Sequence, residues 1–83
     1  MFDDNIKFFI VNFSHIQAID SSGALLFEKL ITICKERGIK MFVCGIKKQP
    51  EKLFKKLSLD KKIGNEYMVN SISDALLYIK DNH

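Results

Sequence analysis

Apolar residues occur along this chain in short runs that are separated by polar segments. Ile6 to Phe13 includes four consecutive apolar residues, Phe8 to Val11, and Lys40 to Cys44 contains a second run. Continuous runs of this length predict strands that are buried on both faces, as in a parallel sheet. Met68 and Val69 predict a short third strand.

Between the first two runs the pattern is that of an amphipathic helix, from about Ala24 to Arg37. At about 100° per residue, one broad arc of this helix is apolar. Leu25 is the exception, because it falls among the charged residues, and Gly38 follows as the expected C-cap. The positions predicted to face the core are Leu26, Phe27, Leu30, Ile31, Ile33 and Cys34.

The second half of the chain predicts a second helix. Pro50 suits a first helical turn, and Leu53, Phe54 and Leu57 are spaced as one apolar face. Leu59 to Gly64 is expected to be a turn.

A last helix is predicted near the end of the chain, capped by Ser71 or Ser73. The whole order predicts one α/β domain over residues 1–83, with a small, mostly parallel sheet and helices packed on it. The core side of the last helix is expected to be Ile72, Ala75, Leu76 and Ile79.

The composition of the chain bears on nucleic-acid binding, metal sites and membrane spans. Thirteen basic and ten acidic residues give a net charge of +3, and no nucleic-acid motif or aromatic platform accompanies it. No nucleic-acid partner is therefore expected. Cys34 and Cys44 lie within predicted elements without metal-ligand spacing, so we expect buried free thiols and no metal. No apolar run approaches the ~18 residues that a membrane span needs.

The stretch with candidate chemistry lies where the first strand leads into the first helix. Asp20, Ser21, Ser22 and Gly23 are types that cap a helix N-terminus, and we expect at least one serine to do so. Capping alone is one interpretation. The other is that an exposed serine at a positive helix end carries or binds a phosphate.

The arrangement of these segments resembles the STAS domain family, named after sulfate transporters and anti-sigma-factor antagonists. The resemblance rests on Asn12 to Ser14, Ile19 to Gly23, Lys35 to Gly38 and Met41 to Cys44. It extends over nearly the whole chain, from about Ile6. It implies a STAS-like sandwich of strands and helices with a regulatory, non-enzymatic role.

The resemblance also implies the site residues. In stand-alone anti-sigma-factor antagonists, a partner kinase phosphorylates the serine that matches Ser21. Asp20, Ser22 and Gly23 match the rest of that loop, and the exposed Leu25 is expected to contact a partner. Phosphorylation would add about −1.5 to −2 charge to this binding face.

The chain resembles two subfamilies of this family. Gly45 to Pro50, Lys61 to Glu66 and Ser71 to Leu76 resemble the cytoplasmic domain of SulP-type sulfate and anion transporters. That version is favoured, and it implies a membrane transporter domain of the same polypeptide as partner, at the cytoplasmic face of the inner membrane. The alternative is a free antagonist whose partner is an anti-sigma-factor kinase.

The family begins with two further strands and a helix, for which this chain has no room before Phe8. The resemblance therefore implies a domain that is truncated at its N-terminus. A sheet that lacks strands has an open edge. Marginal stability and a homodimer or strand exchange are expected.

Lysines are concentrated after the second predicted strand. They either keep a small domain soluble or attract an anionic membrane surface, at roughly 1 kcal/mol for each lysine near the lipid. The lysines concerned are Lys47, Lys48, Lys52, Lys55 and Lys56, followed by Lys61 and Lys62.

An enzyme is not expected. His15, Asp20 and Ser21 lie within one short loop, where a nucleophile, a base and an orienting group are hard to align. Nucleotide binding is associated with the family. Because the chain has no Gly-rich phosphate loop, no cofactor is expected, and nucleotide binding is kept only as an alternative.

Overall fold

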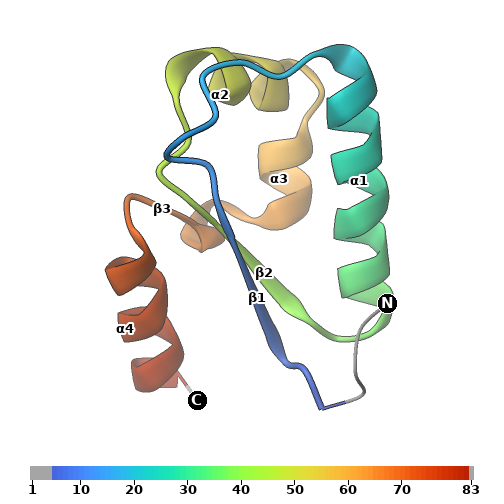
Figure 1. The fold of residues 1–83 in the computed structure, drawn as a ribbon. Coiled ribbons are helices and arrows are strands. Elements are labelled where there is room, and N and C mark those ends of the chain that lie inside the picture. The colour runs from blue at the N-terminus through green and yellow to red at the C-terminus, as the bar shows by residue number, and fades with distance from the viewer. Residues whose placement is uncertain (1–4, 83) are drawn as a thin grey trace.

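The computed structural model describes residues 5–82, which form a three-stranded sheet with helices on both faces (Figure 1). β1 (Phe8–Asn12), β2 (Lys40–Cys44) and β3 (Met68–Val69) lie side by side in the order β1-β2-β3. Both neighbouring pairs are parallel. The α/β class and the small parallel sheet predicted from the sequence are confirmed.

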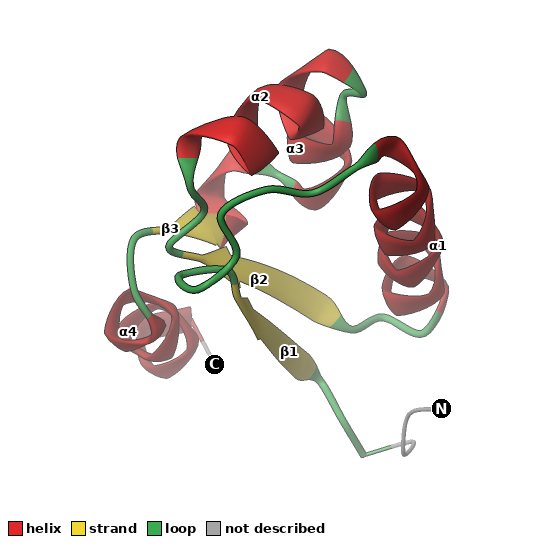
Figure 2. Cartoon of the chain, turned by 45° about the horizontal axis from the view of Figure 1, so that its top comes forward, coloured by secondary structure: helices red, strands yellow, loops and turns green. Residues whose placement is uncertain are grey.

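The helices lie in two layers. α1 (Ser21–Glu36), α2 (Lys48–Lys56) and α3 (Leu59–Ile63) cover one face of the sheet, and α4 (Ile72–Asn82) covers the other (Figures 1 and 2). A 3-10 helix, η1 (Asn65–Tyr67), connects α3 to β3. The sheet is therefore the middle layer of the domain.

β2 is the centre of the core. Met41 and Val43 pack with the helices α1, α2 and α3, while Phe42 and Cys44 pack with α4. This is the two-residue alternation of a strand that is covered on both faces. All four side chains are buried, so the prediction of two-sided burial holds for this strand.

Three phenylalanines hold the end of β1 against the helices. Phe13 meets Phe27 of α1 edge to face at 5.4 Å between ring centroids, and it meets Phe54 of α2 at 5.5 Å. Phe27 and Phe54 lie 5.3 Å apart. This aromatic cluster fixes the point at which the loop toward α1 leaves the sheet.

β1 differs from its prediction. Its residues Phe8 to Val11 are only half-buried, because β1 is an edge strand. The apolar run indicates that both faces of the strand are meant to be covered, but it does not show whether a second neighbour lies beside it. The predicted truncation of the domain before β1 stays a prediction, because Met1 lies outside the described residues.

Several positions predicted to be core are exposed. Leu26 is 67% exposed, and Ile72, Leu76 and Leu57 are also exposed. Ala24, which the helical pattern did not select, is fully buried. Periodicity identifies an apolar arc, but the sheet and its neighbouring helices cover only part of it. Ala24 lies in the core cluster that also includes Phe13 and Val43.

The C-terminus of α1 is a Schellman motif. Arg37 is the C-cap, so the prediction of Gly38 was displaced by one residue. Gly38 has φ +69° and its N–H donates to the C=O of Lys35, while Ile39 N–H donates to the C=O of Cys34. A positive φ suits glycine, and this turn ends α1 at Glu36, so that Arg37, Gly38 and Ile39 connect it to β2.

The segment from Leu59 to Gly64 was predicted as a turn and is mainly the short helix α3. Leu59 and Ile63 are buried against the core cluster that includes Phe54. A helix of five residues is too short to show a helical period in the sequence.

Candidate functional site

The loop between β1 and α1 ends at Asp20, which is the N-cap of α1. Asp20 has an extended backbone, and its Oδ1 accepts a hydrogen bond from the N–H of Gly23 at 2.8 Å. The expectation that a serine caps this helix is therefore wrong. Ser21 and Ser22 instead occupy the first turn of α1. An aspartate at this position satisfies a helix N–H and complements the helix dipole.

This arrangement leaves the two serine hydroxyls available. Ser21 and Ser22 are exposed, and within residues 5–82 neither hydroxyl makes a side-chain hydrogen bond. The first turn of α1 contains no acidic residue. The structure thus presents Ser21 at a positive helix end, as predicted from the sequence, and its phosphorylation stays a prediction.

Gly23 allows the loop to fold back onto the helix. A Cβ atom at this position would lie 3.0 Å from Cγ1 of Ile19 and 3.3 Å from Oδ1 of Asp20. Any larger residue would push against the side chain that caps the helix. The close approach favours glycine at position 23, and its part in a binding or phosphorylation site stays a prediction.

The loop is also held from α2, by a contact that the sequence analysis did not identify. The side-chain amide of Gln49 accepts a hydrogen bond from Ile19 N–H at 2.9 Å and donates one to Ile19 C=O at 3.1 Å. Gln49 therefore pairs with Ile19 as a neighbouring strand would. Gln49 lies in the Gly45 to Pro50 segment that resembles the transporter version, but nothing in the spacing showed its partner.

Exposed leucines adjoin the serines. Leu25 is 58% exposed, as predicted, and the neighbouring Leu26 is also exposed. Ser21 lies one helical turn before Leu25, on the same side of α1. The surface at the start of α1 therefore combines two hydroxyls with an apolar patch, and a partner contact there is a prediction.

An apolar groove runs between β1 and α1, and it ends at this loop. Its volume is about 440 Å³, and it is widely open to solvent. The groove was not predicted from the sequence, because it forms only where a strand edge lies beside a helix. Its lining is Phe9, Val11, Phe13, Ile16, Ala18, Ile19, Gly23, Leu26, Phe27 and Leu30.

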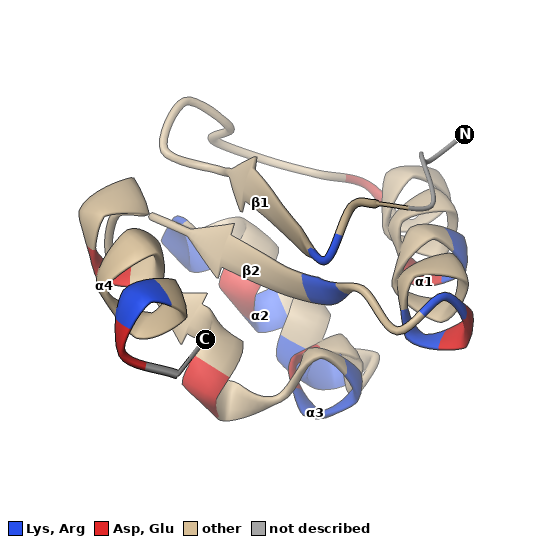
Figure 3. Ribbon diagram, turned by 90° about the horizontal axis from the view of Figure 1, so that it is seen from below, with Lys and Arg blue, Asp and Glu red and all other residues tan. Residues whose placement is uncertain are grey.

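The predicted lysine surface lies on α2. Lys47 precedes the helix as its N-cap residue, and Figure 3 shows basic positions along α2 and α3. Lys55 lies 4.0 Å from Glu51, one turn away, at an exposed and therefore weak ion pair. Lys62 on α3 pairs with Glu28 of α1. All five predicted residues are exposed: Lys47, Lys48, Lys52, Lys55 and Lys56.

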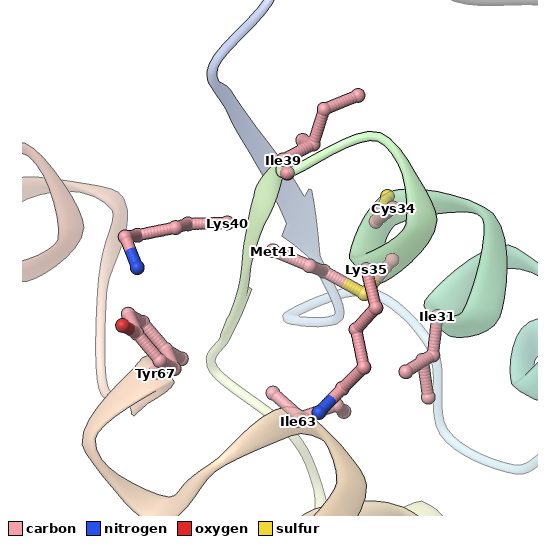
Figure 4. A pocket seen from close by; sticks show the side chains of 9 residues that line it. Ile31, Cys34, Lys35, Ile39, Lys40, Met41, Ile63 and Tyr67 are labelled. Carbon is pink, nitrogen blue, oxygen red and sulfur yellow. The ribbon is translucent and has the colours of Figure 1, made fainter.

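A smaller pocket of about 230 Å³ lies at the other end of α1 (Figure 4). Its floor is apolar and includes Met41 and Ile63, and Lys35 and Lys40 lie at its rim. The Lys40 ammonium lies 5.6 Å from the centroid of the Tyr67 ring. The volume is below the ~300 Å³ at which pockets for small molecules begin, and none of the predicted site residues lines it.

Both cysteines are buried and not in a disulfide. Burial raises the pKa of the Cys34 thiol, and burial together with the Asp74 carboxylate raises the pKa of Cys44. A raised pKa lowers the thiolate fraction and with it the reactivity of the sulfur. This matches the sequence prediction of structural thiols.

Three further features concern the described part of the chain. Between Asn5 and Asn82, no group of three or more His, Cys, Asp or Glu residues is arranged to hold a metal ion. No helix in the same range combines the length and the apolar character that crossing a membrane requires. His15 is exposed in the loop before α1.

Comparison with known proteins places this geometry in context. Residues 2–75 match the family model of the STAS domain. Among solved structures, the crystal structure of a sulfate transporter family protein from Wolinella succinogenes has the same fold, with a TM-score of 0.82 and 23% sequence identity. That match covers 89% of this chain but 61% of that chain. No curated protein sequence matches the chain.

Proposed function

The chain belongs to the STAS domain family, and from this premise we propose that it is the regulatory domain of a SulP-type sulfate or anion permease. The domain is non-enzymatic and works at the cytoplasmic face of the inner membrane. It binds the membrane transporter domain of the same polypeptide through the start of α1. Ser21 and Leu25 are the central residues of that surface.

The observation that carries this proposal is that one residue at the start of α1 caps the helix, while its neighbours remain exposed. Asp20 is occupied by capping Gly23 N–H at 2.8 Å, so the neighbouring serines are left for a partner. Leu25 adds apolar area beside them. Exposed apolar side chains next to polar groups on a rigid helix are typical of a protein interaction surface.

The proposed assignment to a transporter is supported by the resemblance of three sequence segments and by the fold of a structural neighbour. Gly45 to Pro50, Lys61 to Glu66 and Ser71 to Leu76 resemble the transporter version of the domain. The structural neighbour described above is named as a sulfate transporter family protein. Within the structure, Gln49 of the first of these segments holds the Ser21 loop, so that segment contributes directly to the proposed surface.

The lysines of α2 support a location under a membrane. Lys48, Lys52, Lys55 and Lys56 fall on one arc of the helix, and the buried Phe54 lies on the opposite side. Each lysine near an anionic lipid surface contributes about 1 kcal/mol. A domain tethered below a transporter would present this arc to the lipid headgroups.

The second candidate is a stand-alone anti-sigma-factor antagonist that is switched by a partner kinase. The exposure of Ser21 at a helix N-terminus favours it, because a kinase needs an accessible hydroxyl. A phosphate of about −1.5 to −2 charge would alter the binding face directly.

Fractionation of cells that produce the protein separates the two candidates. An antibody against this domain is used on immunoblots of the membrane and cytosolic fractions. A large band in the membrane fraction is the expected result. A band near ~10 kDa in the cytosol, the size of one small domain, would overturn the transporter assignment and favour the antagonist.

A further inference from the structure

The pocket of about 230 Å³ lies where the C-terminal end of α1, the start of β2, the end of α3 and η1 meet (Figure 4). Within residues 5–82, β3 pairs only with Val43 and Cys44, so on that side the start of β2 lies beside η1 rather than beside a strand. The residues that line the pocket all fall between Ile31 and Tyr67. The pocket is therefore built without β1.

The base of this pocket is apolar and consists of side chains that are themselves buried. An apolar cavity of about 150 Å³ is large enough to hold benzene, so this pocket has room for an apolar group of roughly six carbons. A volume below the usual range for drug-sized ligands limits the ligand to a molecule of few atoms. The residues of the base are Ile31, Cys34, Ile39, Met41 and Ile63.

The mouth of the pocket is basic. Figure 4 shows Lys35 extending from α1 toward Ile63 and Lys40 extending from β2 toward Tyr67. The Lys40 ammonium lies 5.6 Å from the centroid of the Tyr67 ring. Within residues 5–82, neither lysine forms an ion pair, and none of the lining residues is acidic. In this part of the chain, the positive charge at the mouth therefore has no anionic partner.

The end of α1 does not cancel this charge. A helix C-terminus is equivalent to about −0.5 elementary charge, which is less than the charge of one lysine. The C=O groups of Cys34 and Lys35 also accept hydrogen bonds from Ile39 N–H at 2.8 Å and from Gly38 N–H at 3.2 Å. An anion at the mouth would thus meet ammonium groups and not unpaired carbonyl groups of these two residues.

We propose that this pocket binds a small monocarboxylate whose apolar body has about six carbons. The apolar body lies on the buried base, and the carboxylate lies at the mouth beside the Lys35 and Lys40 ammonium groups. A sulfate ion fits less well, because it would lose water against the apolar base without gaining hydrogen bonds there. An uncharged alcohol of the same length fits the base but not the mouth. This inference goes beyond the proposed function, because it needs no transporter domain.

Methyl resonances of the 83-residue protein report on the pocket directly. Hexanoate is the probe, and it is added at millimolar concentrations while the spectrum is recorded by NMR. The methyl groups of Ile31, Met41 and Ile63 should shift with a saturable dependence on hexanoate. Those of Leu25, near the other end of α1, should not shift.

Two double variants test the role of the lysines. Lys35→Gln with Lys40→Gln should weaken hexanoate binding by about tenfold, because the carboxylate loses two cations at a partly exposed site. Lys29→Gln with Lys80→Gln is the matched control. It removes the same charge from exposed positions that do not line the pocket, so the affinity should stay close to that of the parent protein.

Sulfate and 1-hexanol separate the two halves of the proposed ligand. Each should bind more weakly than hexanoate. If 1-hexanol shifts the same methyl groups with equal affinity, the pocket selects apolar surface alone and the proposal is overturned. Equal affinity for sulfate overturns it as well, because the apolar base would then contribute nothing. It also fails if hexanoate causes no saturable shift, or if the two double variants bind hexanoate equally well.

Discussion

Gln49 and Ile19 are joined by two hydrogen bonds, in which the side-chain amide of Gln49 accepts from Ile19 N–H and donates to Ile19 C=O, although thirty residues separate them. The contact connects the start of α2 to the loop that ends in Asp20 and Ser21. It therefore links the lysine-bearing helix to the proposed binding surface. A glutamine can do this because its amide has the donor and acceptor arrangement of a peptide group.

Replacing Gln49 with alanine should loosen the loop. Two hydrogen bonds at an exposed position are lost, so the free energy of unfolding should fall by about 1 kcal/mol. Exchange of the Ile19 amide should become faster. Chemical denaturation and hydrogen exchange measure these effects. Gln17→Ala is the control, because Gln17 is an exposed loop residue. Equal effects of both substitutions would show that the Gln49 contact does not hold the loop.

We predict that Asp20 stabilises the folded protein by capping α1. Asp20→Ala removes the acceptor of Gly23 N–H and should lower the free energy of unfolding by about 1 kcal/mol, measured by thermal or urea denaturation. Asp20→Asn keeps an oxygen at the same place and should restore most of that stability. If asparagine and alanine are equally destabilising, the charge at the helix end rather than the cap hydrogen bond is responsible.

The features that could be predicted from the sequence are those that depend on neighbouring residues in the chain. β2 was predicted from Lys40 to Cys44, and its bounds agree fully, because a central strand buries both faces and has a continuous apolar pattern. Leu25 was correctly placed outside the core. These predictions depend only on neighbouring residues.

The features that were missed depend on distant residues. Nothing near Ile19 in the sequence points to Gln49 as its partner. The exposure of Leu26 depends on how far the sheet extends beneath α1. The choice of Asp20 over the serines as cap depends on where the helix begins, and the helix begins at Ser21. The spacing of apolar residues along the chain does not predict such contacts.

The buried thiols predict a loss of stability at high pH. Burial holds the pKa of Cys34 above its ordinary value of 9.0, and burial with the Asp74 carboxylate does the same for Cys44. The folded state therefore keeps its protons where the unfolded state releases them. Stability is fully present below the ordinary thiol pKa and falls as pH rises through the raised values.

Urea denaturation across the alkaline range measures this effect. A variant with Cys34→Ala and Cys44→Ala should lose part of the pH dependence, because tyrosines and lysines still titrate. Identical slopes for the variant and the parent protein would contradict the assignment.

The lysines of α2 predict binding to anionic lipid. The double substitution Lys52→Ala and Lys56→Ala should weaken binding to vesicles that contain phosphatidylglycerol by about 2 kcal/mol, or about thirtyfold. Cosedimentation at low salt measures it. Lys29→Ala with Lys35→Ala is the control, since it removes the same charge from exposed positions on α1. Equal losses in both variants would indicate attraction to net charge alone.

The central claim is that the start of α1 contacts a membrane transporter domain. The most direct measurement replaces Leu25 with a photo-cross-linking amino acid in cells that produce the protein and identifies the product by mass spectrometry. Leu77 on α4 is the matched control, at 57% exposure against 58% for Leu25. We predict cross-links from position 25 to a membrane transporter domain, weakened by Ser21→Asp. Equal cross-linking from both positions, or none to such a domain from position 25, would contradict the claim.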